Sequence, residues 1–258
     1  MEAGAILEFD PVFVALAVAA MLLAGFVKGA VGFALPMVAA AGIGSLTSAQ
    51  ETVALMVFPT LASNLWLALR QGFGPALVSA RRFWKLNLLL VLTIGFAAQA
   101  VPRLSSAVLF LVLGVVVSGA AAVQLAGWKP RPVREPARQR RWEVLTGVGS
   151  GIMGGLTGVW SPPVVFYLLT LDLEKRMQVR TMGLTFMLGA VVLVPARAVS
   201  GVMGGPIAAL SLFLCLPMAA GMWAGLRLQD RLEPRTFRRI TLVVLCLAGL
   251  NLLRRGLM

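Results

Sequence analysis

The residues best suited to chemistry lie within an apolar run, in the stretch GFVKGAVGFALP from Gly25 to Pro36. The spacing of Gly32 and Pro36 favours the end of one helix and the start of another. The first turn of a helix offers backbone N–H groups and the positive end of the helix dipole, and both favour anions. Lys28 lies in the same stretch and adds a cation. The stretch therefore predicts an anion-binding site inside a membrane-like segment.

The second half of the chain repeats this spacing. The positions Gly25, Gly29, Gly32 and Pro36 recur 126 residues later as Gly151, Gly155, Gly158 and Pro162. A shared GxxxGxxGxxxP pattern at one offset predicts an internal duplication. New helices are expected to begin near Phe33–Leu35 and near Val159–Ser161, so two positive helix ends would face a common centre.

Side chains near the two breaks are candidates for the walls of this site. Ser161 and Thr157 can donate hydrogen bonds, and Asn64 is a polar residue in the middle of an apolar segment. The predicted substrate-binding set is Lys28, Gly32, Phe33, Ala34, Leu35, Pro36, Asn64, Thr157, Gly158, Val159, Trp160, Ser161, Pro162 and Arg197.

Each of these candidates also has an ordinary structural interpretation. Trp160 and Phe33 can be packing residues, and GxxxG glycines often serve only to bring helices close together. Lys28 lies near the end of its segment and can reach the membrane interface instead. Arg197 and Arg70 can be anchors at the membrane boundary.

Composition places the chain in a membrane. It has 258 residues, of which 59% are hydrophobic and 13% are charged, about half the charge of a soluble domain. The N-terminus has no basic region before its first apolar segment, so we expect that segment to be retained. The net charge of +13 reflects basic loops between apolar spans rather than a nucleic-acid partner.

The residues that are absent narrow the function. The chain has no histidine, which excludes His-based zinc sites and Ser-His-Asp hydrolysis. None of its ten acidic residues falls in the middle of an apolar segment. Cation transporters and proton pumps usually keep a carboxylate there. The sequence therefore favours an anion as substrate and predicts neither enzymatic activity, nor a cofactor, nor a metal site.

The predicted fold is an all-α polytopic membrane protein with two inverted repeats of about four to five helical segments each, broken or re-entrant at the Gly/Pro motifs. The first repeat spans 1–126, a basic linker spans 127–142, and the second repeat spans 143–258. The expected apolar segments are 11–31, 34–47, 52–70, 85–101, 105–126, 143–158, 161–172, 180–200, 206–227 and 237–253.

The distribution of basic residues predicts the orientation. Eighteen of the 23 Lys and Arg residues lie in 70–85, 127–142, 172–180 and 227–239. The positive-inside rule assigns these loops to the cytoplasm. The N-terminus and the C-terminus are then both expected outside, and segment 85–101 runs opposite to its duplicate 206–227. Inverted repeats with Gly/Pro-interrupted segments indicate a secondary transporter.

The stretches GFVKGAVGFALPMVAAAGI (25–43) and GIMGGLTGVWSPPVVFYLL (151–169) resemble the signature segments of the TauE/SafE family, the sulfite exporter or toluene sulfonate uptake permease family. The likeness covers nearly the full chain, including its length, duplicated halves and basic central loop. Family members often carry Gly-Gly before the first proline, where Ala34 and Leu35 stand here, and the bulkier residues would reshape the pocket.

The resemblance implies an inner-membrane transporter of a sulfur-containing anion, either an organosulfonate or sulfite. The expected partners are that small anion, the lipid bilayer and, for uptake, H⁺ or Na⁺ as a coupling ion. Two alternatives stay open: a transporter of another small anion such as a carboxylate, and a membrane assembly factor that transports nothing.

Overall fold

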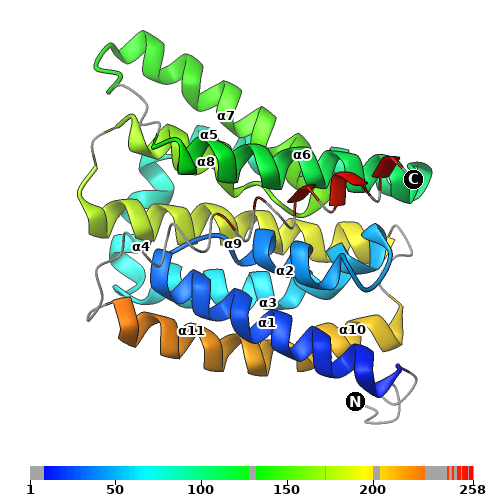
Figure 1. Cartoon of the computed structure of the whole chain (residues 1–258). Coiled ribbons are helices and arrows are strands. Elements are labelled where there is room, and N and C mark those ends of the chain that lie inside the picture. Colours follow the sequence, from blue (N-terminus) through cyan, green and yellow to red (C-terminus); the bar gives the residue numbers. More distant parts are fainter. Residues whose placement is uncertain are drawn as a thin grey trace.

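A computed structural model of the chain is built from helices (Figure 1). It describes residues 9–127, 132–171, 173–199 and 204–229, with isolated positions from 243 to 257. The helices are α1 (Pro11–Val31), α2 (Leu35–Ile43), α3 (Ala49–Leu69), α4 (Phe73–Arg82), α5 (Trp84–Ala98), α6 (Ser106–Leu125), α7 (Pro136–Thr157), α8 (Ser161–Leu169), α9 (Lys175–Val199), α10 (Gly205–Phe213) and α11 (Cys215–Gln229), with one 3₁₀ turn at Val101–Arg103.

The length and apolarity of the helices confirm an all-α polytopic membrane protein. In the described ranges, five stretches are long and apolar enough to cross a bilayer: Pro11–Ala30, Ala49–Leu69, Ser106–Val123, Arg176–Pro195 and Gly205–Leu228. No β-strand occurs among the described residues. The helices α2 and α8 have nine residues each, too few to cross a hydrocarbon core of about 30 Å.

Several predicted boundaries were wrong. The expected loop 70–85 contains α4, and the expected linker 127–142 contains the first turns of α7, which begins at Pro136. Proline suits the first turn of a helix because its missing N–H needs no partner there. The expected segment 206–227 is confirmed as one apolar stretch, Gly205–Leu228, with a break at Leu214 between α10 and α11. Most of the expected segment 237–253 lies outside the described residues.

The helix order of the first half recurs in the second. The series α1, α2, α3 corresponds to α7, α8, α9, and α8 begins 126 residues after α2. In Figure 1, α1 and α7 run in opposite directions, and so do α3 and α9. Packing follows the same relation, since α1 lies along α11, α5 lies along α7, and α3 lies along α9. This arrangement is the one expected of inverted repeats.

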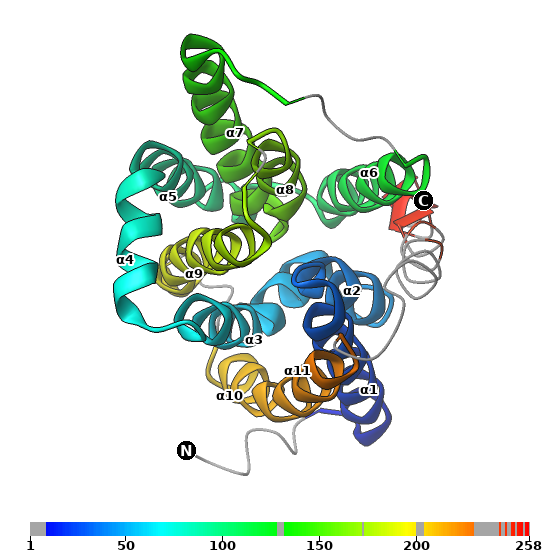
Figure 2. The same cartoon turned by 90° about the vertical axis from the view of Figure 1, so that its left-hand side faces the viewer.

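Glycines allow the closest of these helix contacts. A Cβ built on Gly25 would lie 2.2 Å from the carbonyl oxygen of Met218, and one on Gly221 would lie 2.0 Å from that of Leu22. Both distances are far below van der Waals contact. The backbones of α1 and α11 therefore meet directly, as small residues allow in membrane helices. Figure 2 shows α1 and α11 side by side when the bundle is viewed after a 90° turn.

Candidate functional site: a buried lysine between two helix breaks

Both Gly/Pro motifs break a helix at the predicted place. Gly32 ends α1 with φ 86°, and Gly158 ends α7 with φ 72°. Both glycines are therefore in the left-handed conformation. The next helices start at Leu35 and Ser161, and neither start has a side-chain cap. Left-handed glycine is the usual helix stop because it carries no Cβ. Each half thus supplies one uncapped helix N-terminus.

The first break contains a strained residue. Ala34 adopts φ 78° and is the one non-glycine with positive φ among the described residues. A left-handed conformation costs a residue with a Cβ about 1–2 kcal/mol.

Replacing Ala34 with glycine should stabilise the protein. Relief of the left-handed strain, about 1–2 kcal/mol, exceeds the entropy that glycine adds to the unfolded chain, about 0.5–1 kcal/mol. A higher melting temperature for Ala34→Gly in detergent is the expected result. The matched change Ala39→Gly, inside α2 and fully buried, should lower it. A lower melting temperature for both variants would show that Ala34 is not strained.

Lys28 lies inside the bundle rather than at the membrane interface. Its side chain is 1% exposed. The Nζ donates hydrogen bonds to Ser63 Oγ at 2.9 Å and to Asn64 Oδ1, both on α3. Both partners are neutral, and no carboxylate among the described residues pairs with this amine. A buried ammonium is normally paired with a negative group.

Two side chains of the second half that carry hydrogen-bond donors line the same small pocket as Lys28. The pocket is lined by Lys28, Phe33, Ala34, Pro36, Asn64, Trp160, Ser161 and Phe186. The Trp160 Nε1 and the Ser161 Oγ are buried and have no hydrogen-bond partner in the described part of the structure. Buried polar atoms are rarely left without partners. The pocket therefore combines a cation with two unused donors.

The two halves contribute differently to this pocket. At the 126-residue offset, Lys28 corresponds to Gly154 and Ser63 corresponds to Gly189. Trp160 occupies the space that side chains at Gly154 and Gly189 would need. A Cβ added to Gly154 would lie 2.8 Å from the Cβ of Trp160, and a Cβ added to Gly189 would lie 3.1 Å from the Cε2 of Trp160. The first half thus supplies the charge, and the second half supplies the indole.

The family relationship follows from a comparison of the whole chain. A family model described as "Sulfite exporter TauE/SafE" matches residues 17–252. The chain belongs to the TauE/SafE family. Membership implies a membrane transporter, not an enzyme. Searches of the curated proteins and of the solved structures gave no match.

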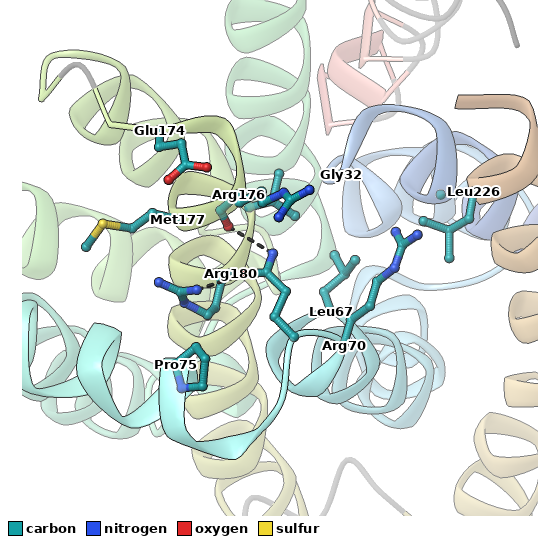
Figure 3. A pocket seen from close by; sticks show the side chains of 12 residues that line it. Gly32, Leu67, Arg70, Pro75, Glu174, Arg176, Met177, Arg180 and Leu226 are labelled. Carbon is teal, nitrogen blue, oxygen red and sulfur yellow. Dashed lines mark hydrogen bonds between the residues drawn. The ribbon is translucent and has the colours of Figure 1, made fainter. Parts of the chain in front are cut away.

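In this TauE/SafE protein a larger cavity reaches the first motif from the side of the α3–α4 and α8–α9 loops. It measures about 830 Å³ and is lined by Gly29, Gly32, Leu67, Arg70, Gln71, Pro75, Glu174, Arg176, Met177, Val179, Arg180 and Leu226. In Figure 3 the guanidinium groups of Arg70 and Arg176 extend into this opening near Gly32. We call this cavity the basic vestibule.

Hydrogen bonds hold one wall of the basic vestibule. Arg180 donates to Ser79 Oγ at 2.9 Å and to Gln71 Oε1 at 2.8 Å. Gln71 in turn donates to the carbonyl of Arg176 at 3.1 Å (Figure 3). These bonds tie α4 and the α3–α4 loop to α9. Arg70, Arg176 and Arg180 outnumber Glu174, so the vestibule presents positive charge to an anion.

The structure brings only some of the predicted site residues to the TauE/SafE pocket. Thr157 instead shapes the break, because its Oγ1 donates to the Met153 carbonyl at 2.7 Å and accepts from the Val159 N–H at 3.1 Å. The predicted residues that do not line the pocket are Gly32, Leu35, Thr157, Gly158, Val159 and Pro162. The side chain of Arg197 lies outside the described part of the structure. Phe186 of α9 lines the pocket and was not predicted, because a phenylalanine in an apolar helix carries no signal.

Proposed function

We propose that this protein is a secondary transporter of a sulfur-containing anion, sulfite or an organosulfonate, across the bacterial inner membrane. The observation that supports this most directly is the pocket shared by Lys28, Trp160 and Ser161. An ammonium has three N–H donors, and Ser63 and Asn64 accept two of them. A bound anion would accept the third and would neutralise the buried charge.

The arrangement of the available donors favours a sulfur oxyanion. Lys28 Nζ, Trp160 Nε1 and Ser161 Oγ are three donors around one pocket, and a sulfite or sulfonate group has three oxygens. A carboxylate can accept as many hydrogen bonds, but its two oxygens lie in one plane, whereas the three oxygens of sulfite or a sulfonate point toward three separate donors. The uncapped N-termini of α2 and α8 add favourable potential for any anion.

The pocket must open for transport. Its volume is about 10 Å³, which is room for about one water molecule and too little for a sulfonate. Phe33 and Phe186 line it and are the side chains we expect to move. The basic vestibule is the larger cavity on one side, so opening toward it would give the anion a path. Rocking of one repeat against the other is the usual form of such opening.

The predicted orientation places the basic vestibule at the cytoplasmic face, with both chain termini outside. Each negative charge that leaves a cell at about 100 mV, inside negative, gains about 2.3 kcal/mol. Export of the anion is therefore downhill at equal concentrations. Uptake would require a coupling ion such as H⁺ or Na⁺. Among the described residues, Glu174 of the basic vestibule is the one carboxylate that lines either the vestibule or the pocket.

Flux in vesicles tests this proposal. Purified protein reconstituted in liposomes should move labelled sulfite or a sulfonate faster than empty liposomes, and faster than acetate or another matched carboxylate. An imposed membrane potential should drive the anion toward the positive side. Equal rates for carboxylates would show that the substrate class is broader, and no flux of any anion would leave the assembly-factor alternative.

A further inference from the structure

An apolar groove, separate from the anion pocket, lies between α6, α7 and α8. Its volume is about 1060 Å³. Most of its lining is apolar, and the lining residues used below are Val123 and Gly119 of α6, Arg138, Trp142, Thr146 and Met153 of α7, and Pro162 and Pro163 of α8. Because α6 is a candidate membrane span and the lining is mostly apolar, we expect the groove to lie within the hydrocarbon of the bilayer along much of its length.

Polar side chains gather at one end of the groove. Arg138, Trp142 and Thr146 follow one another at intervals of four residues and therefore share a face of α7. Val123 is near the end of α6 and Arg138 is near the start of α7, and both residues line the groove. From 134 to 143 the chain has four arginines and two glutamates. This end therefore attracts negative charge, and tryptophan is typical of the membrane interface.

The length of the groove fits one lipid chain. Fifteen residues separate Arg138 from Met153, which corresponds to about 22 Å along a helix. One leaflet contributes half of a bilayer that is about 40–45 Å thick with its headgroups included. A headgroup beside Arg138 would therefore leave its acyl chain beside Met153, Pro162 and Pro163.

We propose that this groove binds an anionic phospholipid, with its phosphate at Arg138 and Trp142 and one acyl chain between α6, α7 and α8. The lipid would cover the face of α8 that carries Pro162 and Pro163, next to Ser161. The site is independent of the anion pocket, because none of its charged residues lines that pocket.

Native mass spectrometry of the detergent-purified protein tests the site. Phosphatidylglycerol should bind about tenfold more tightly than phosphatidylcholine with the same acyl chains, because both carry the phosphate but phosphatidylcholine adds a choline cation that is repelled by the positive charge of Arg138. Arg138→Gln should abolish the difference. Gly119→Phe should weaken both lipids by filling the groove, and an added Cβ at Gly119 meets no atom within 4 Å, so the variant should fold.

Two matched variants serve as controls. Arg140→Gln removes a charge from the same helix without lining the groove, and Gly149→Phe adds a ring where a Cβ also meets nothing within 4 Å. Both should bind lipid like the unmodified protein, and melting curves should show that all four variants are folded. Equal binding of the two lipids to the unmodified protein would overturn the proposal. Unchanged lipid binding in Gly119→Phe would also overturn the proposal. A dimer of the unmodified protein that Gly119→Phe dissociates would overturn it too, because the groove would then hold a second copy of the chain.

Discussion

Replacing Lys28 with methionine should weaken anion binding by about 3 kcal/mol, or roughly 100-fold, because a buried charge partner is removed from the pocket. Methionine has a similar length and no charge, so it fits among the apolar neighbours. The stability of the protein without ligand should stay the same or rise, since a buried charge without a counter-charge is costly. The measurement is the rise in melting temperature with sulfite or sulfonate concentration, which reports ligand bound to the folded state.

The control for this prediction separates charge from shape. Lys28→Arg keeps the positive charge and should retain part of the anion-dependent stabilisation. Arg103→Gln removes a charge from the 3₁₀ turn, which does not line the pocket, and should leave the anion-dependent stabilisation unchanged. If Lys28→Met is stabilised by the anion as strongly as the unmodified protein, Lys28 has only a structural role.

Replacing Gly221 with alanine should destabilise the protein by about 3 kcal/mol, at the upper end of the cost of overpacking. The new Cβ would lie 2.0 Å from the carbonyl oxygen of Leu22, and this atom is backbone that no side-chain rotation can move. Helices α1 and α11 would have to separate, and Lys28 is on α1. Thermal unfolding in detergent measures the effect, with loss of folded protein as the extreme result.

The matched substitution for Gly221→Ala is Gly149→Ala. Gly149 is also in a helix, but an added Cβ there meets no atom within 4 Å. Alanine favours helix over glycine by about 1 kcal/mol, so this variant should be unchanged or slightly more stable. Similar melting temperatures for the two alanine variants would contradict the direct backbone contact between α1 and α11.

Local spacing was sufficient to predict the helix breaks. Glycine and proline act on the backbone within a few residues of their own position, and α2 and α8 begin where the motifs indicate. The amphipathic α4 was missed because its polar residues resemble a loop to a hydropathy reading. The early start of α7 was missed for the same reason, since its first turns carry arginines rather than apolar residues.

The composition of the pocket required the tertiary fold. The partners of Lys28 lie 35 and 36 residues away on α3, and no spacing rule connects them. Asn64 was a candidate because it is polar, but Ser63 was not in the predicted set. Pro162 was placed in the site because it and Gly158 bracket the helix break, yet it faces the groove. The direction of a side chain at a helix start depends on how the helix is rotated against its neighbours, which the sequence does not show.

Equilibrium binding of labelled sulfite to the purified protein tests the anion site most directly. We expect saturable binding at one site per chain, competed by sulfonates more strongly than by matched carboxylates. Binding should be roughly 100-fold weaker in Lys28→Met and less strongly weakened in Ser161→Ala and in Trp160→Phe, each of which removes one donor from the pocket. Unchanged binding in all three variants would contradict the assignment of the anion to the pocket between the two helix breaks.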